Sequence, residues 1–78
     1  MYEWGNDKNK ANQARHGVAF EAVGQFDWDG ALVMFDERED YGETRYIAVG
    51  RIGTRLHVLA FTDRGDKVRV ISLRKANK

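Results

Sequence analysis

The residues best suited to chemistry lie near the C-terminal end of the chain. In the run 67–76, β-branched apolar residues alternate with cations, among them Arg69 and Arg74. Alternation with a period of two predicts a half-buried strand. Such a strand holds guanidinium groups in fixed positions, where their planar donors suit phosphate oxygens. The run therefore predicts a site for a phosphate-bearing ligand.

Charge is distributed unevenly along the chain. Residues 27–43 contain seven acids and one base, whereas residues 44–78 contain nine bases and two acids. The formal net charge of +1 hides this polarity. A cationic C-terminal half favours an anionic partner, and the acidic stretch 36–43 is expected as a water-exposed loop. The alternative interpretation is that the cations are only solvated surface.

The two histidines have different expected roles. His16 stands just before Gly17 at the expected end of a helix, where the helix dipole stabilises an imidazolium. Beside arginines, such a histidine could transfer protons in RNA cleavage through the 2′-hydroxyl group, which needs no metal ion. A plain helix-cap role is the alternative. His57 is expected on the core side of the sheet, beside the Ser72 hydroxyl. The histidines and carboxylates match no zinc or calcium pattern.

The elements that must position these residues follow from local signals. Asn6 as N-cap and Gly17 as C-terminal glycine predict a helix over 7–15. Apolar residues at a spacing of four predict a second helix over 18–26. Residues 1–4 are either a short strand or an extended lead. The helices precede a sheet whose strands are expected at 31–35, 44–52, 55–62 and 67–74.

The expected fold class is α+β, with two N-terminal helices packed on a four-stranded antiparallel sheet. Gly53-Thr54 suits a two-residue hairpin turn. Strict alternation then places Arg45, Lys67 and Arg69 on one face, where they could converge on one phosphate group, and Arg74 on the other. The expected pairs across the last two strands are Thr62 with Lys67 and Ala60 with Arg69.

Length and composition bound the remaining possibilities. Seventy-eight residues predict a single domain, 1–78. The sequence has no cysteine, which excludes disulfides and thiolate chemistry. No apolar run approaches the roughly 20 residues of a membrane span, and no signal-peptide pattern follows the N-terminus. We expect a cytoplasmic protein with no membrane partner.

Several segments together resemble the BrnT family of toxins. Trp4, Lys8 and Asn12 follow one another at a spacing of four, and the segment Arg15-His16-Gly17-Val18 precedes Phe20. The C-terminal segment Arg-Val-Ile-Ser-Leu-Arg-Lys-Ala at 69–76 is similar to the family's Arg-Ile-Ile-Ser-Ala-Arg-Lys-Ala. The match extends over almost the whole chain.

The resemblance implies a RelE-like fold and a metal-independent endoribonuclease toxin, a hydrolase without cofactor that cleaves mRNA and inhibits growth. It also implies a cognate BrnA-like antitoxin with a ribbon-helix-helix fold. The toxin would contact DNA only indirectly, through its complex with that antitoxin. The family normally continues into a C-terminal helix, which is apparently missing from this chain. That difference motivates the alternative of a non-catalytic RNA- or protein-binding module of the same fold.

Carried onto this sequence, the resemblance and the residue pattern predict two groups of site residues and no metal ligand. The catalytic candidates are His16, Arg45, Arg69 and Arg74. The RNA-binding candidates are Lys8, Arg15, Arg51, Lys67 and Lys75.

Overall fold

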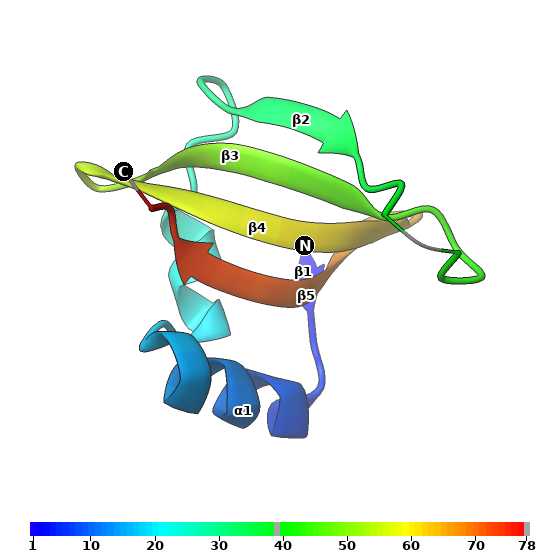
Figure 1. The fold of residues 1–78 in the computed structure, drawn as a ribbon, viewed down its shortest axis with the longest axis horizontal. Coiled ribbons are helices and arrows are strands. Elements are labelled where there is room, and N and C mark those ends of the chain that lie inside the picture. The colour runs from blue at the N-terminus through cyan, green and yellow to red at the C-terminus, as the bar shows by residue number, and fades with distance from the viewer. Residues whose placement is uncertain (39, 78) are drawn as a thin grey trace.

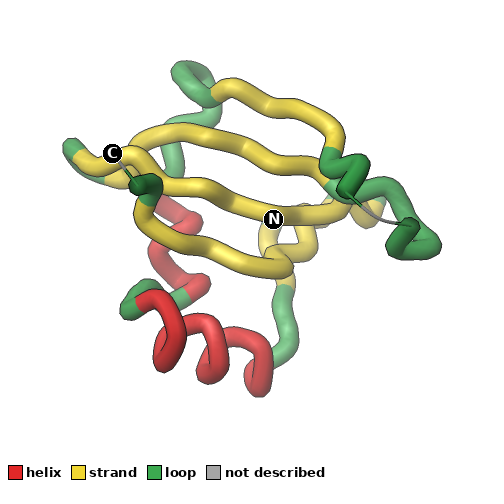
Figure 2. Tube along the Cα trace, viewed as in Figure 1, coloured by secondary structure: helices red, strands yellow, loops and turns green. Residues whose placement is uncertain are grey.

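The computed structural model describes residues 1–38 and 40–77. Within them a five-stranded sheet carries its helices on one side (Figures 1 and 2). The strand order is β1-β5-β4-β3-β2. The elements, in chain order, are β1 (Tyr2–Glu3), α1 (Asn6–His16), the 3₁₀ helix η1 (Phe20–Gln25), β2 (Leu32–Phe35), β3 (Tyr46–Ile52), β4 (Arg55–Arg64) and β5 (Lys67–Lys75). We call the side of the sheet away from the helices the open face.

The expected α+β class is confirmed, but two details of the expected architecture are wrong. The second helix is a 3₁₀ helix, held by bonds three residues apart such as Phe26 N–H to the Val23 carbonyl at 3.0 Å. Val23 and Gly24 both lower α-helix propensity, which favours this shorter form. The sheet is also mixed, because Tyr2–Glu3 adds a fifth strand parallel to β5.

The C-terminal limit of α1 follows the expected signals, but the expected N-cap is wrong, because Gly5 caps the helix and Asn6 is its first residue. Asp7 lies in the first turn, and Arg15 and His16 lie in the last turn. Gly17 adopts a left-handed conformation with φ of 74°, and its N–H donates to the Gln13 carbonyl at 2.8 Å. Because nearly all of α1 is polar, contacts outside the helix must hold it in place.

The core lies between the helices and the covered face of the sheet. Phe20, Leu59 and Leu73 are fully buried in it, and burial of such a side chain contributes about 1.5–3 kcal/mol. Trp28 joins the turn before β2 to this core, with its ring 4.9 Å from that of Phe26 and 5.3 Å from that of Phe61. The buried apolar residues are Val18, Phe20, Val23, Phe26, Ala48, Leu59, Phe61, Val70 and Leu73.

Asn12 fastens α1 to the edge of β5. Its amide nitrogen donates to the Leu73 carbonyl at 2.7 Å and to the Val18 carbonyl at 2.9 Å. Its amide oxygen accepts the Leu73 N–H at 3.2 Å. β1 pairs only with Val68 and Arg69. The Asn12 side chain therefore takes the place of a neighbouring strand where β1 has ended, and it leaves no buried backbone group of Leu73 unpaired.

The pairing of β3 with β4 agrees with the sequence, whereas the expected pairing of β4 with β5 is wrong. Gly53-Thr54 is the turn of the first hairpin, and Val49 pairs with Val58. In the second hairpin, Thr62 pairs with Arg69 and Ala60 with Ser72. The reason is that β4 continues to Arg64 and turns through two residues, whereas the sequence suggested a longer loop.

A β-bulge at Ile71 changes which side chains share a face. Phe61 pairs with Val70 and Ala60 with Ser72, so Ile71 is an additional residue on β5. Beyond it the alternation is shifted by one. Arg74 therefore lies on the open face with Arg69, and the expected placement of Arg74 on the other face is wrong. For the same reason Ser72 is not beside His57, whose partner on β5 is Lys75.

We predict that Asn12→Ala lowers the free energy of unfolding by about 3 kcal/mol, because it leaves buried backbone groups of Leu73 and Val18 without partners. Urea unfolding followed by circular dichroism measures the loss. Gln13→Ala, at an exposed position of the same helix, is the control and should change stability by less than about 0.5 kcal/mol. Equal effects of the two substitutions would contradict the role given to Asn12.

Candidate nucleic-acid interface

A cationic hollow lies between α1 and β5. Its volume is about 230 Å³. Lys8, Arg15 and His16 come from one side of α1, because residues four or seven to eight positions apart lie on the same side of a helix. We call it the helix–strand hollow. It is lined by Lys8, Ala11, Asn12, Arg15, His16, Ile71 and Ser72.

The charges around this hollow favour an anion. No carboxylate is among its lining residues. Lys8 and Arg15 are exposed and His16 is half-buried, and none of the three forms an ion pair within residues 1–38 and 40–77. Their positive potential is therefore not cancelled locally, as it would be on a mixed surface.

A second hollow, the open-face groove, begins on the other side of Ser72. Its volume is about 330 Å³. Arg74 borders it, and its Nη1 donates to the Lys75 carbonyl at 3.4 Å. The opposite wall comes from the segment after β2 and is acidic. The groove is lined by Met34, Phe35, Asp36, Glu37, Arg38, Ile47, Val58, Ala60, Ser72 and Arg74.

Ser72 lines both hollows, so the two form neighbouring parts of one surface. His16 reaches this surface from α1, and Arg74 reaches it from the open face of β5. The bulge at Ile71 makes this possible, since without the extra residue Ser72 and Arg74 would face the core. His16 thus lines one hollow and Arg74 lines the other, and Ser72 lies where the two hollows adjoin.

Arg69 and Lys67 are engaged elsewhere. Nη1 of Arg69 lies 3.4 Å from a carboxylate oxygen of Glu3, and Nζ of Lys67 lies 3.9 Å from the other. Glu3 reaches them because β1 pairs in parallel with β5, with Glu3 opposite Arg69. The two cations thus share a carboxylate of the chain itself.

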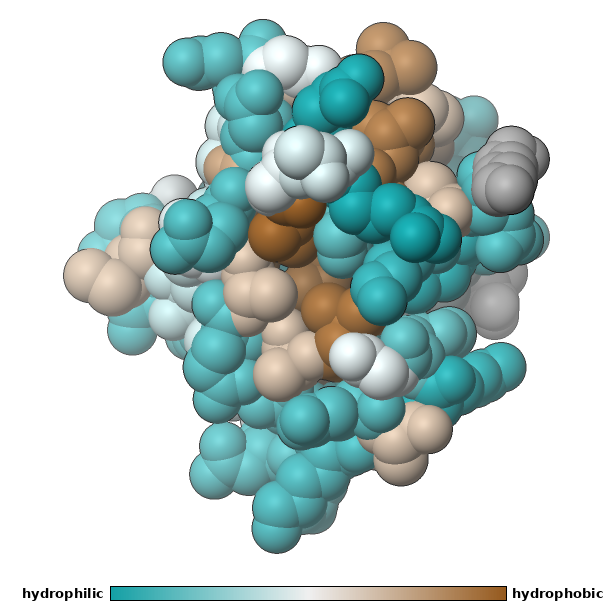
Figure 3. Space-filling model, turned by 90° about the vertical axis from the view of Figure 1, so that its left-hand side faces the viewer, coloured by the Kyte–Doolittle hydropathy of each residue, from teal (hydrophilic) through white to brown (hydrophobic). Residues whose placement is uncertain are grey.

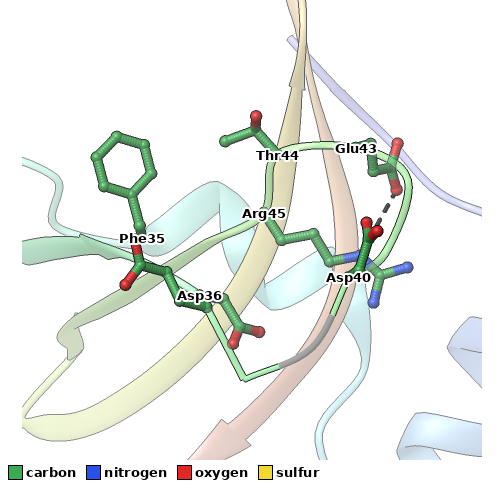
Figure 4. A pocket seen from close by; sticks show the side chains of 7 residues that line it. Phe35, Asp36, Asp40, Glu43, Thr44 and Arg45 are labelled. Carbon is green, nitrogen blue, oxygen red and sulfur yellow. Dashed lines mark ion pairs between the residues drawn. The ribbon is translucent and has the colours of Figure 1, made fainter.

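Arg45 lies in an acidic hollow of about 630 Å³ (Figure 4). Its guanidinium lies 3.9 Å from the centre of the Tyr41 ring, and its Nε lies 3.6 Å from Glu43. An acidic hollow repels RNA. The expected convergence of Arg45, Lys67 and Arg69 on one phosphate is therefore not observed, because Arg45 pairs with Glu43 and the other two with Glu3.

Asp36 anchors the acidic segment to the end of β2. Arg38 donates to its two carboxylate oxygens, each at 2.8 Å, and the Tyr41 hydroxyl donates at 3.2 Å. These bonds, the Arg38 bond foremost, hold the pKa of Asp36 well below its usual range, and the same pair raises the pKa of Arg38. Asp36 is buried, so the expectation of an exposed loop is wrong at its first residue.

The remaining candidates lie apart from Ser72. Arg51 is exposed on the open face near the Gly53-Thr54 turn. Lys75 pairs with His57 and so is directed to the helix side of the sheet. His57 is buried, with Nδ1 2.8 Å from the Arg55 carbonyl, which agrees with a core role.

Sequence reasoning missed the role of Asn12 and the position of Ser72. A signal for Asn12 was present, since it lies four residues from both Lys8 and His16 on the same side of a polar helix. No local signal in the sequence reports the bulge that turns Ser72 outward.

Among the described residues, no three His, Cys, Asp or Glu side chains gather as a metal site requires. No helix in this part of the chain is long and apolar enough to cross a membrane.

The fold and the surface around Ser72 define a small α+β protein suited to a polyanionic ligand. The sequence profile of the family described as the ribonuclease toxin BrnT of type II toxin–antitoxin systems matches residues 4–78. The chain therefore belongs to the BrnT family, and the resemblance found in the sequence is confirmed. The family has RNA as its substrate and an antitoxin as its partner. No curated protein matches the chain.

We predict that Asp36→Asn lowers stability at neutral pH, because Arg38 and Tyr41 lose an ionised acceptor. The lowered pKa of Asp36 means that its contribution is fully present above the ordinary value of about 3.9 and is lost as the pH falls below it. The difference from the parent protein, measured by urea unfolding, should therefore shrink below pH ~4. The exposed neighbour Glu37→Gln is the control, and a difference independent of pH would contradict the assignment.

Proposed function

We propose that this protein is a metal-independent endoribonuclease toxin that cleaves mRNA at the surface around Ser72. The observation that carries the proposal is the meeting of the two hollows there, with His16 on one side and Arg74 on the other. Membership of a ribonuclease toxin family supports the reaction class. The packing of helices on one face of the sheet supports a RelE-like relationship.

In the proposed reaction, the 2′-oxygen of a ribose attacks the adjacent phosphorus and the bond to the 5′-oxygen breaks. The products are a 2′,3′-cyclic phosphate and a free 5′-hydroxyl group. The 2′-hydroxyl proton passes to water, and His16 donates a proton to the departing 5′-oxygen. The position of His16 in the last turn of α1, where it lines the helix–strand hollow beside Ser72, supports this role.

The cations have distinct proposed roles. Arg74 stabilises the charge that develops on the phosphorane, because it borders Ser72 and forms no ion pair within the described residues. Lys8 and Arg15 hold neighbouring phosphates along α1. Arg51 contacts RNA farther along the open face.

The other candidates receive lesser roles. Arg69 and Lys67 contact RNA only after release from Glu3, and Arg45 only after release from Glu43. Lys75, on the helix side of the sheet, is the weakest RNA contact. We further propose that the antitoxin is a BrnA-like ribbon-helix-helix protein. The toxin–antitoxin complex would contact DNA through the antitoxin. The toxin itself would act in the cytoplasm, where mRNA is found.

We predict that Arg74→Ala lowers the single-turnover cleavage rate by roughly 10²-fold, because one donor to the transition-state charge is lost. Cleavage of a labelled RNA in excess chelator measures it. Lys75→Ala is the matched control, since Lys75 is adjacent in sequence but directed to the other side of the sheet. An equal loss in both variants would remove Arg74 from the site, and loss of all cleavage in chelator would overturn the metal-independent mechanism.

We predict that His16→Ala lowers the cleavage rate by about 10²-fold or more and removes the fall in rate that deprotonation of the imidazole causes as the pH rises. A pH–rate profile between about pH 5 and 9 distinguishes this role from a helix cap. A variant that is slower but keeps the parent profile would show that His16 is structural.

A second function, RNA binding without cleavage, is favoured by one observation: three of the candidate cations are paired with Glu3 or Glu43. Both functions predict that Lys8→Ala weakens RNA binding and reduces the log–log salt slope by about 0.7. Only the binding module predicts intact RNA after long incubation. Filter binding at several salt concentrations, with the RNA then analysed on a gel, separates the two.

A further inference from the structure

We propose that the outer edge of β2 is a docking edge for an extended segment of another protein, one with apolar residues at its centre and Lys or Arg at both ends. The segment would pair with β2 as an added strand. This inference does not depend on the proposed cleavage reaction, because it concerns the outer edge of β2, which is directed away from β3, β4 and β5.

The first observation is that β2 is an apolar strand exposed on both of its faces. It is an edge strand of the sheet, and only β3 pairs with it in the described structure. Exposure is 65% for Leu32, 46% for Val33, 42% for Met34 and 64% for Phe35. Figure 3 shows apolar side chains at the height of β2, surrounded by hydrophilic ones. An exposed apolar edge of this kind is a template for strand pairing.

The second observation concerns the direction of the backbone groups. The Asp36 N–H donates to the Arg45 carbonyl at 2.8 Å, so Asp36 is a hydrogen-bonded position opposite β3. Met34, two residues earlier and paired with Ile47, continues the same series of hydrogen-bonded positions. Since hydrogen-bonding direction alternates along an antiparallel strand, Leu32 and Met34 bond to β3, and Val33 and Phe35 direct their N–H and C=O groups outward. The chain places neither lysine nor proline on β2, the residues that commonly block such edges.

The charge at the two ends of β2 selects the occupant. Asp29 lies before β2, and Glu37 and Asp40 lie after it; all three are exposed. In an antiparallel pair of two copies, the acidic start of one β2 would meet the acidic end of the other, which is repulsive. A segment with cations at both ends would instead place opposite charges at both ends. Charge complementarity therefore favours a basic, extended partner over a second copy.

The experiment uses two synthetic peptides of alternating valine and threonine, one with two lysines and one with two glutamates at each end. Binding to the full chain is followed by fluorescence anisotropy. The lysine peptide should bind at least about tenfold more tightly than the glutamate peptide. Equal binding of both peptides, or binding of neither, would overturn the proposal.

Variants of Val33 test the geometry. Val33→Pro removes an outward N–H without touching the β3 ladder, and an edge strand accepts proline in that position. It should weaken binding of the lysine peptide about tenfold, whereas the control Val33→Thr, which keeps the N–H, should not. Unchanged binding by Val33→Pro would refute strand addition. So would a dimer of the parent chain that Val33→Pro dissociates, since the occupant would then be a second copy.

A further measurement leaves the protein unaltered, in case Val33→Pro does not fold. The lysine peptide is N-methylated on every residue between its charged ends, so that neither of its edges can donate hydrogen bonds. Loss of binding would support backbone pairing, and retention of binding would refute it. RNA cleavage assayed in parallel should be the same for Val33→Thr and Val33→Pro, so a failure here is distinguishable from a failure of the proposed function.

Discussion

The arrangement of this protein depends on one buried amide. Asn12 donates to the carbonyls of Leu73 and Val18 and accepts the N–H of Leu73, so it joins a polar helix, the segment that follows it and the edge of β5. α1 has little apolar surface of its own to pack, and Asn12 is its only buried residue in the described structure. Its neighbours Lys8, Arg15 and His16 are aligned along β5 because this amide fixes the helix there.

The bulge on β5 has a comparable effect on the other half of the site. One extra residue, Ile71, lets Val70 and Leu73 both enter the core while Ser72 and Arg74 turn to the open face. A regular strand could not do this, because its side chains alternate strictly. Bulges often redirect a side chain beside a functional site, and here the bulge brings the Ser72 hydroxyl and the Arg74 guanidinium to the open-face groove, which adjoins the helix–strand hollow at Ser72.

Acidic side chains define the surface as much as cations do. Glu3 holds Arg69 and Lys67, and Glu43 holds Arg45, whereas Lys8, Arg15 and Arg74 beside the two hollows that meet at Ser72 form no ion pair within the described residues. Asp29 and Asp40 lie before and after β2 at an edge of the sheet, whereas Asp36 and Glu37 also line the open-face groove. The cationic surface near Ser72 is the one proposed for RNA, and the acidic, apolar edge of β2 is the one proposed for a protein segment. The outer edge of β2 can act separately from Ser72 and Arg74, because two strands, β3 and β4, lie between β2 and β5, which carries both residues.

The sequence by itself determined the α+β class, the C-terminal end of α1, the first hairpin and the family, because these depend on local signals: a glycine after a helix, alternation within a strand, a two-residue turn and an ordered set of motif residues. It also identified His16 and Arg74 as candidates. Only the tertiary structure decided that β1 joins the sheet, that 20–25 is a 3₁₀ helix and that Arg74, not Arg45, borders the open-face groove with Ser72. These features depend on pairing between distant segments and on one inserted residue, and neither leaves a periodic trace in the chain.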